Sequence, residues 1–255
     1  MVLTIAGSDS GGGAGIQADL KTFSALGVFG TTAITCVTVQ NPDDVSAVAS
    51  VPETIVALQI RKVCDAFPVA AAKTGMLYSA DIIKSVARAV KRNRIGRLVV
   101  DPVMIATSGA PLMRNDALGA LCRNLLPLAS VVTPNIPEAE VLAGMSIRGV
   151  LDMEIAAGRI GRRWKTAVVV KGGHLKGKTL VNVLFDDGVI HTFRLPRVRA
   201  SSTHGTGCVF SASVAAYLAH GRDLPDAVGR AGKFVARAIA TSVRVGKHDA
   251  LNIAL

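Results

Sequence analysis

Short β-branched segments alternate with longer helical patterns along most of this 255-residue sequence. The segments Leu98-Val99-Val100 and Val168-Val169-Val170 are continuous apolar runs, which is typical of strands that helices cover on both faces. Strands and helices that alternate in this way form βαβ crossovers, so the strands lie parallel to one another. The pattern predicts an α/β fold with a mostly parallel sheet. The length and the lack of a linker predict one domain over residues 1–255.

The expected parallel strands are Val2–Ala6, Gly30–Val39, Val69–Lys73, Arg97–Val100, Ser130–Val132 and Ala167–Val170. The expected helices are Ile16–Leu26, Pro52–Phe67, Ser79–Asn93, Asp116–Leu126, Pro137–Ala143, Asp152–Trp164, Gly207–Ala219 and Leu224–Val245. Two further runs, Thr179–Phe185 and Val189–Phe193, flank Asp186-Asp187-Gly188, which is a hairpin pattern. They predict an antiparallel pair at an edge of the sheet.

Polar or glycine-rich segments follow each of the six expected strands. They are Gly7–Gly15, Gln40-Asn41-Pro42, Thr74-Gly75-Met76, Asp101-Pro102-Val103, Thr133-Pro134-Asn135 and Gly172-Gly173-His174. In an open parallel sheet, ligands bind outside the carboxyl ends of the strands. The sequence therefore predicts a ligand site where these segments meet.

The chain has an excess of positive charge, with 29 Lys and Arg residues, 18 Asp and Glu residues and a formal net charge of +11. This charge favours anionic ligands, among them nucleic acids, acidic membranes and phosphorylated small molecules. The basic residues are dispersed, however, and aromatic residues make up only 4%, so stacking platforms for single strands are scarce. We expect a solvated basic surface without a specific nucleic-acid partner. The uncharged stretches Phe23–Pro42 and Ala200–Gly221 contain polar residues and Gly or Pro, so we expect no membrane span.

Four cysteines lie far apart in apolar or glycine-rich surroundings, without a C-x-x-C pair. This distribution fits reduced thiols in the cytoplasm better than a disulfide framework. The segment Met1–Ala6 lacks the basic start of a signal peptide and predicts a first strand. We therefore expect a cytoplasmic protein.

The segment Gly7–Gly15 holds five glycines between a strand and a helix. Such a loop lets backbone amides approach a ligand closely, because no Cβ atoms obstruct them. It matches neither the Walker A pattern nor the dinucleotide-binding G-x-G-x-x-G pattern. A flexible turn is the alternative. Ligand contact is favoured because Gln17 and Asp19 follow in the first turns of the helix.

The segment His204-Gly205-Thr206-Gly207-Cys208 precedes Val209–Ala219, which is nearly uncharged and predicts a buried helix. A buried helix N-terminus has unsatisfied amides and partial positive charge, and both favour an anion. Gly205 and Gly207 allow those amides to form a nest for a transferring phosphoryl group. In the first turn, the helix dipole is expected to lower the pKa of the Cys208 thiol. The alternative for Cys208 is a small core residue.

Four polar residues near the expected strand ends each allow two interpretations. Asn135 and Glu138 lie three residues apart, so they either contribute to a Mg²⁺ site or form a helix capping box. Lys171 either binds a nucleotide phosphate or extends to solvent. Asp101 is either a carboxylate near a metal ion or a turn residue before Pro102.

Four motifs, taken together, resemble one family. They are Ala6–Asp19, Thr133-Pro134-Asn135, Lys171-Gly172-Gly173-His174 and His204-Gly205-Thr206-Gly207-Cys208. The family is the hydroxymethylpyrimidine/phosphomethylpyrimidine kinases of thiamine biosynthesis, in the ribokinase-like superfamily, and the resemblance runs from residue 1 to about residue 245. The glycine-rich start with Gln17–Phe23 is highly specific, whereas Gly205-Thr206-Gly207 alone indicates only the superfamily.

The resemblance implies a three-layer α/β/α fold, ATP and Mg²⁺. It implies phosphorylation of 4-amino-5-hydroxymethyl-2-methylpyrimidine, and then of its monophosphate to the diphosphate. Relatives tend to be homodimers. A pyridoxine/pyridoxal kinase of the same superfamily is the alternative. A nucleotide-responsive nucleic-acid-binding protein, suggested by the net charge, is a remote one.

The resemblance also implies roles for residues of this sequence. Gln40 matches the residue that bonds the aminopyrimidine edge, and the pocket would be lined by Ala14, Asp19, Met76 and Val103. Asn135 and Lys171 match the nucleotide side, with Asp101 and Glu138 near Mg²⁺. Gly205, Thr206 and Gly207 match the anion hole, and Cys208 matches the base.

Two segments depart from the family pattern. Pro42-Asp43-Asp44-Val45 replaces a Thr-Gly-type turn over the substrate, and Val245–Ala250 lacks a Gly-x-Gly-Pro continuation.

Overall fold

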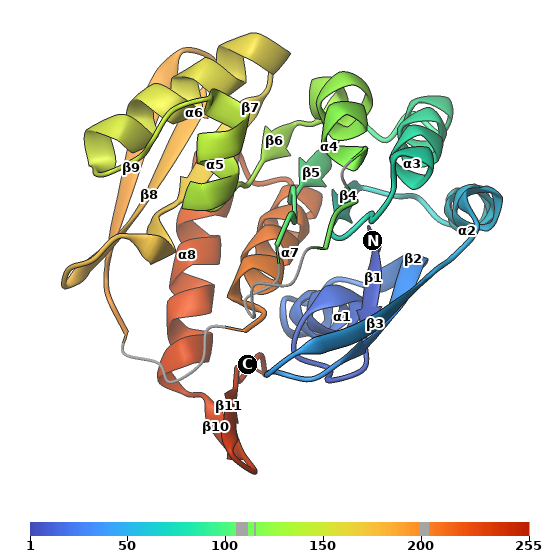
Figure 1. Cartoon of the computed structure of the whole chain (residues 1–255), viewed down its shortest axis with the longest axis horizontal. Helices are drawn as coiled ribbons and strands as arrows, with labels where there is room; N and C mark the ends of the chain where they lie inside the picture. The colour runs from blue at the N-terminus through green and yellow to red at the C-terminus, as the bar shows by residue number, and fades with distance from the viewer. Residues whose placement is uncertain (106–111, 115, 199–203, 255) are drawn as a thin grey trace.

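The computed structural model of this protein has a central sheet with helices on both faces (Figure 1). It describes residues 1–105, 112–114, 116–198 and 204–254. Within these residues, nine strands form one sheet in the order β3-β2-β1-β4-β5-β6-β7-β8-β9. Their bounds are β1 (Val2–Asp9), β2 (Gly30–Gln40), β3 (Val45–Ser50), β4 (Ala71–Thr74), β5 (Leu98–Val100), β6 (Val131–Val132), β7 (Ala167–Lys171), β8 (Thr179–Asp186) and β9 (Val189–Pro196).

The helices form two layers because side chains on a strand alternate between the two faces of the sheet. The helices are α1 (Gly15–Ala25), α2 (Glu53–Ala66), α3 (Ala80–Arg92), α4 (Ala117–Ala120), α5 (Ile136–Ala143), α6 (Val150–Trp164), α7 (Thr206–Ala219) and α8 (Leu224–Ala240). Val168 and Val170 pack into the core that contains α2–α6, whereas Val169 packs into the core that contains α1, α7 and α8. This arrangement is the three-layer α/β/α fold that we expected.

The parallel strands and the antiparallel pair of β8 and β9 are confirmed. The sequence analysis missed β3, which pairs antiparallel with β2, so both edges of the sheet are antiparallel. The β3 sequence, Val-Ser-Ala-Val-Ala-Ser, has short side chains that are mostly exposed or half-buried, and its apolar pattern is therefore weak.

The helix expected to run to Val245 is wrong at its end. α8 stops at Ala240, and a short hairpin of β10 (Val243–Val245) and β11 (His248–Ala250) follows. The Thr241 N–H and hydroxyl both bond the Arg237 carbonyl, which closes the last turn. β-branched Thr and Val residues at this point favour a strand over a longer helix.

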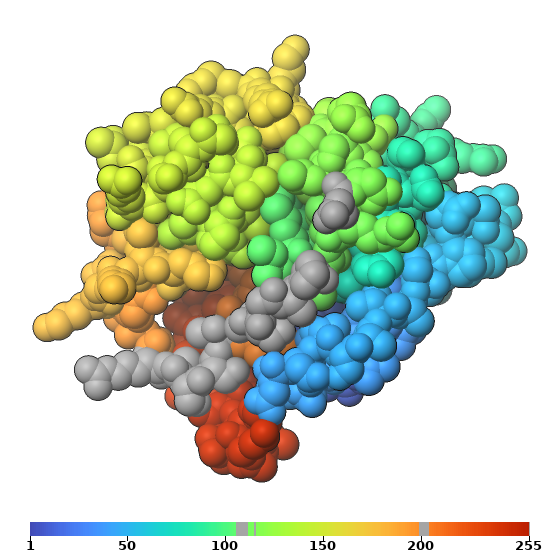
Figure 2. Space-filling model, in the orientation of Figure 1, coloured from blue at the N-terminus to red at the C-terminus, as the bar shows by residue number. Residues whose placement is uncertain are grey.

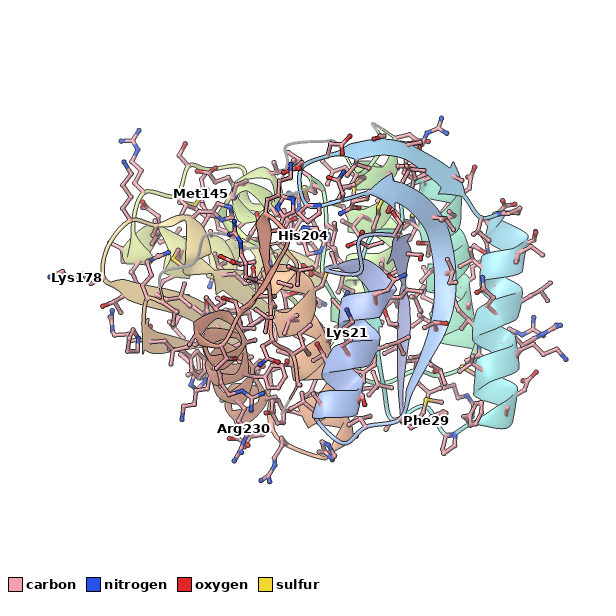
Figure 3. The ribbon with its side chains drawn as sticks, turned by 90° about the horizontal axis from the view of Figure 1, so that it is seen from below. Lys21, Phe29, Met145, Lys178, His204 and Arg230 are labelled. Carbon is pink, nitrogen blue, oxygen red and sulfur yellow. The ribbon has the colours of Figure 1, made fainter. Side chains whose placement is uncertain are left out.

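α7 is apolar on most faces and is buried along most of its length, as predicted from its nearly uncharged sequence. It lies between α1 and α8 and begins at the carboxyl end of the sheet. Figure 3 shows the two ends of the sheet, with Phe29 before β2 at one end and His204 before α7 at the other. In the described residues, no helix is long and apolar enough to cross a membrane.

Candidate active site

A cavity of about 910 Å³ lies at the carboxyl ends of the parallel strands, and its volume suits a small-molecule site. Beside β8 and β9 the surface is hollowed and α8 is visible inside (Figure 2). The predicted site residues that line this cavity are Ala14, Gln40, Met76, Asp101, Val103, Asn135, Glu138, Lys171, Gly205, Thr206, Gly207 and Cys208. Asp19 is fully buried and does not line it.

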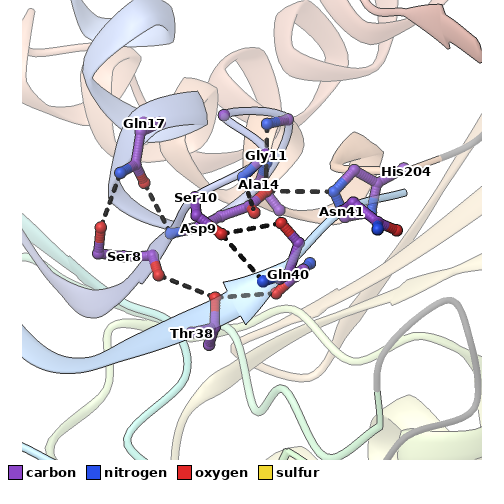
Figure 4. A network of polar contacts seen from close by, with 12 residues as sticks. Ser8, Asp9, Ser10, Gly11, Ala14, Gln17, Thr38, Gln40, Asn41 and His204 are labelled. Atoms are coloured by element: carbon purple, nitrogen blue, oxygen red, sulfur yellow. Dashed lines mark hydrogen bonds and ion pairs between the residues drawn. The ribbon is translucent and has the colours of Figure 1, made fainter. Parts of the chain in front are cut away.

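The glycine-rich loop between β1 and α1 is held by Asp9. Its carboxylate accepts hydrogen bonds from the N–H groups of Gly11 (2.8 Å), Gly13 (3.1 Å) and Ala14 (2.8 Å), as Figure 4 illustrates in part. Gln17 supports the same loop, because its side-chain oxygen Oε1 accepts a hydrogen bond from the Asp9 N–H (2.9 Å). These bonds give the loop a defined conformation, so a flexible turn is not what the structure shows.

The same loop contacts the segment that precedes α7. His204 Nε2 lies 3.2 Å from Oδ2 of Asp9. Gly205 has a φ of +81°, and a Cβ atom there would overlap the carbonyl oxygen of Gly13. Both glycine-rich segments therefore need glycine for their close approach. The predicted anion-binding end of α7 therefore lies directly against the glycine-rich loop, which is predicted to contact the substrate.

Gln40 lies at the end of β2, where two neighbours contact it (Figure 4). The Ser10 hydroxyl donates to the Gln40 carbonyl (2.8 Å) and accepts from the Gln40 N–H (2.9 Å). The Thr38 hydroxyl donates to Oε1 of Gln40 (3.2 Å). Ser10 thus holds the Gln40 backbone, whereas the Thr38 hydroxyl is shared between Oε1 of Gln40 and the closer Ser8 carbonyl oxygen at 2.9 Å. The Gln40 side chain lines the cavity, where its NH₂ group can donate to an acceptor.

Asp101 and Lys171 form an ion pair under the start of α7. Nζ of Lys171 lies 3.0 Å from Oδ1 of Asp101, and Ser211 of α7 donates to the other carboxylate oxygen at 3.1 Å. A Cβ atom on Gly207 would lie 3.3 Å from Nζ of Lys171. Burial disfavours the ammonium ion, but Asp101 and Glu138 outweigh that effect and raise the pKa of Lys171. Lys171 is therefore a fixed positive charge beside the helix N-terminus.

Asn135 and Glu138 form the capping box at the start of α5. The Asn135 side chain accepts from the Glu138 N–H, and the Glu138 carboxylate accepts from the N–H groups of Asn135 (2.9 Å) and Met104 (3.2 Å). Burial raises the pKa of Glu138 despite the nearby Lys171. Among the described residues, no three or more His, Cys, Asp or Glu side chains are grouped to hold a metal ion.

The expected low pKa of Cys208 is wrong. Burial raises the pKa of this thiol to about 11, although Lys73 and a backbone hydrogen bond with Gly15 act to lower it. The helix dipole was the basis of our expectation, which left out the cost of desolvating a buried thiolate. Cys208 is half-buried and lines the cavity.

Residues 9–252 match the family model described as phosphomethylpyrimidine kinase. The chain belongs to the phosphomethylpyrimidine kinase family. It is a kinase of the ribokinase-like fold, as the sequence resemblance indicated.

Two curated relatives show how far the likeness extends. The chain is 47% identical over 250 residues to the hydroxymethylpyrimidine/phosphomethylpyrimidine kinase of Haemophilus influenzae, covering 96% of this chain and 93% of the relative. It is 46% identical over 252 residues to the thiamine biosynthesis bifunctional protein ThiED of Geobacter sulfurreducens. That match covers 98% of this chain and 51% of the relative, so the chain spans about half of the bifunctional protein.

Two solved structures are also similar. The phosphomethylpyrimidine kinase from Clostridium difficile is 40% identical, with a TM-score of 0.83, and 93% of this chain and 98% of that one are covered. The pyridoxal kinase from Staphylococcus aureus in complex with AMP-PCP and pyridoxal is 34% identical, with a TM-score of 0.90, and 99% and 92% of the two chains are covered. A kinase named for phosphomethylpyrimidine and a kinase named for pyridoxal therefore share this fold.

Sequence reasoning missed three contributors to the site. Asp9 organises the first loop, and an Asp before consecutive glycines is a pattern that could have found it. His204 was quoted only as part of a motif. Lys73 follows an apolar run on β4 and was interpreted only as the end of a strand.

The two segments that depart from the family pattern contact each other. Lys247, in the turn of the β10–β11 hairpin, places Nζ 2.7 Å from Oδ2 of Asp43, and Nε2 of His248 lies 3.4 Å from the same oxygen. The hydrogen bond from Lys247 lowers the pKa of Asp43. The turn after β2 is thus tied to the C-terminal hairpin.

Proposed function

We propose that this kinase uses ATP to phosphorylate the hydroxymethyl group of 4-amino-5-hydroxymethyl-2-methylpyrimidine, and then the monophosphate so formed. The observation that carries the proposal is the arrangement of one cavity, lined by the Gln40 side-chain amide on one side and by Lys171 and the start of α7 on the other. An aminopyrimidine offers ring-nitrogen acceptors to Gln40. The close likeness to kinases named for these substrates supports the same assignment.

In the proposed reaction, the alcohol oxygen attacks the γ-phosphorus of ATP. The new O–P bond forms as the bond to the β–γ bridging oxygen breaks, and ADP leaves with that electron pair. The amides of Gly205, Thr206 and Gly207 stabilise the transferring group, and Cys208 as the thiolate accepts the proton of the alcohol. Lys171 and Asn135 bind the nucleotide, and a backbone bridge joins these two residues.

We assign the Mg²⁺ contact to Asp101, with Glu138 behind it. Mg²⁺ in nucleotide sites is bound by one or two carboxylates together with substrate phosphates, and it neutralises charge on the transferring group. Both residues line the cavity, and both carboxylates already have partners. Asp101 is bonded to Lys171 and Ser211, and Glu138 holds the backbone at Asn135 and Met104. This donor set fits an ion that arrives with the nucleotide better than a permanent metal site.

The test of the proposed function is incubation with ATP, Mg²⁺ and the aminohydroxymethylpyrimidine, followed by mass spectrometry for the mono- and diphosphate. Pyridoxal kinase activity is the second candidate, because the S. aureus pyridoxal kinase has nearly the same fold. Measuring kcat/KM for both substrates separates the two. A higher value for pyridoxal would make pyridoxal kinase the main activity.

We further propose that residues 1–255 act as one cytoplasmic kinase domain and that the protein is a homodimer without a specific nucleic-acid partner. Light scattering on the purified protein tests the dimer. A duplex-binding titration at two salt concentrations tests the role of the +11 charge, because non-specific binding weakens steeply with salt.

A further inference from the structure

A buried ion pair at the edge of the cavity has no part in the reaction as proposed above. Nζ of Lys73 lies 2.9 Å from both carboxylate oxygens of Asp19, and Thr4 donates to Oδ2 of Asp19 at 2.6 Å. The side chains of Lys73 and Asp19 are completely buried. Removing two charges from water is costly, and well-packed apolar residues often serve stability as well or better. The pair therefore calls for a role besides stability.

The topology places this pair under the first turn of α7. Ala71 of β4 packs against the core that contains α7, and Lys73, two residues further along the strand, lies on the same face. Asp19 belongs to α1, and both α1 and β4 contact α7. A Cβ atom on Gly75 would lie 2.9 Å from Nζ of Lys73, so the glycine allows the backbone to pack closely against the ammonium ion. Lys73 and Cys208 adjoin the same cavity.

Charged groups from four segments act on Cys208. Lys73 of β4 is the largest influence that opposes burial and lowers the pKa of the thiol, whereas Asp19 of α1 and Asp101, directly after β5, raise it. Lys171 of β7 also interacts with Cys208. The two residues of the ion pair thus act on the thiol with opposite sign, and neither touches solvent.

We propose that the Asp19–Lys73 pair controls the charge on Cys208, with Lys73 favouring the thiolate and Asp19 favouring the thiol. Lys73 is a positioning residue in this scheme, because it acts through Cys208. Its rigid attachment to both Asp19 oxygens fixes the distance at which its charge acts. The proposal builds on the function that we assign to Cys208 as the base.

The experiment is a titration of Cys208 by iodoacetamide across pH, with the modified peptide quantified by mass spectrometry so that the other three cysteines do not interfere. The variants are Lys73→Met, Asp19→Asn and the double variant Asp19→Asn/Lys73→Met. At a fixed alkaline pH below the midpoint, Lys73→Met is expected to slow the alkylation of Cys208 and Asp19→Asn to speed it, because a nearby positive charge favours the thiolate and a negative one disfavours it. A pair with only a structural role predicts no such opposite changes.

Lys73→Met leaves the Asp19 carboxylate buried without its partner, so this variant is the one most at risk of not folding. The comparison of Asp19→Asn with the double variant avoids that problem and isolates the Lys73 charge. At the same pH, alkylation of the double variant should be slower than that of Asp19→Asn. Equal rates in these two proteins, or single variants that change in the same direction, would overturn the proposal.

Alkylation needs neither ATP nor a pyrimidine, so its outcome does not depend on the proposed function. The pH profile of kcat/KM is measured on the same proteins. Opposite alkylation shifts with unshifted kinase profiles would support the control of Cys208 charge while removing Cys208 as the base. Parallel shifts in both measurements support both proposals.

Discussion

Nε2 of His204 lies 3.2 Å from Oδ2 of Asp9, and this contact joins two segments that are 195 residues apart in sequence. The same Asp9 oxygen accepts hydrogen bonds from Gly13 and Ala14 of the first loop. One carboxylate therefore sets both the shape of the loop beside the substrate end and its position against the start of α7. Phosphoryl transfer depends chiefly on positioning, so small displacements at this contact should have large effects on the reaction rate.

Asp9→Asn is expected to destabilise the protein by about 1–3 kcal/mol, because an amide cannot accept all the backbone hydrogen bonds that the carboxylate accepts. Urea unfolding measures the loss. Burial acts to raise the pKa of Asp9, but the bonds from His204, Ala14 and Gly11 outweigh it and lower that pKa below its ordinary value of 3.8. The stabilisation is therefore present above about pH 4 and is lost as pH falls through the lowered pKa. An unchanged acid limb in Asp9→Asn would contradict this account.

Gly205→Ala is expected to lower kcat strongly and to destabilise the protein by at least about 1 kcal/mol, from the left-handed φ alone. The new methyl group would also displace Gly13. Gly96→Ala is the matched control, because its φ is ordinary and no atom lies within 4 Å of the added Cβ. Thermal unfolding and steady-state kinetics on both variants check the prediction, and equal effects would exclude a special role for Gly205.

Cys208→Ala is expected to reduce kcat by about 10²–10⁴-fold while nucleotide binding persists, which is the usual contribution of a general base. Because the pKa of the thiol is about 11, the rate of the unaltered enzyme should rise with pH across the neutral and mildly alkaline range. That rise should be absent in the variant. Cys64→Ala, on α2 and away from the cavity, serves as the control. A near-normal kcat in Cys208→Ala would leave the residue only a packing role.

Lys171→Met is expected to weaken ATP binding by about 10–100-fold, since a hydrogen bond to a charged group contributes about 1.5–3 kcal/mol. Lys171→Arg keeps the charge and should retain part of the affinity. Isothermal titration with AMP-PCP measures it. Lys178→Met is the control, because Lys178 extends away from the protein (Figure 3) and does not line the cavity. Equal affinity in Lys171→Met and Lys178→Met would place the nucleotide elsewhere.

The predictability of each element followed the strength of its local pattern. Leu98–Val100 and Val168–Val170 are apolar enough to predict buried strands, and the uncharged stretch after Cys208 predicts a buried helix. β3 has no comparable pattern, because an exposed edge strand buries little side-chain surface. The end of α8 was missed because the turn after Ala240 lacks Gly or Pro.

Within the site, the carboxyl ends of parallel strands predicted which loops would meet, because that follows from chain direction alone. Chain direction did not predict which charged side chains would pair with each other. Asp19 was expected on the pocket wall, and the structure instead buries it completely against Lys73. Periodicity gave no means to predict an ion pair between residues 54 positions apart.

Strand–helix alternation and short motifs are local properties of the chain, so the sequence alone predicted the layers of the fold, the edge of the sheet that carries the cavity, and the family. The raised pKa of Cys208, the burial of Asp19 and the contact between Asp9 and His204 could not be predicted from these local patterns. These depend on desolvation and on distances between residues remote in sequence, and both quantities exist only once the chain has folded.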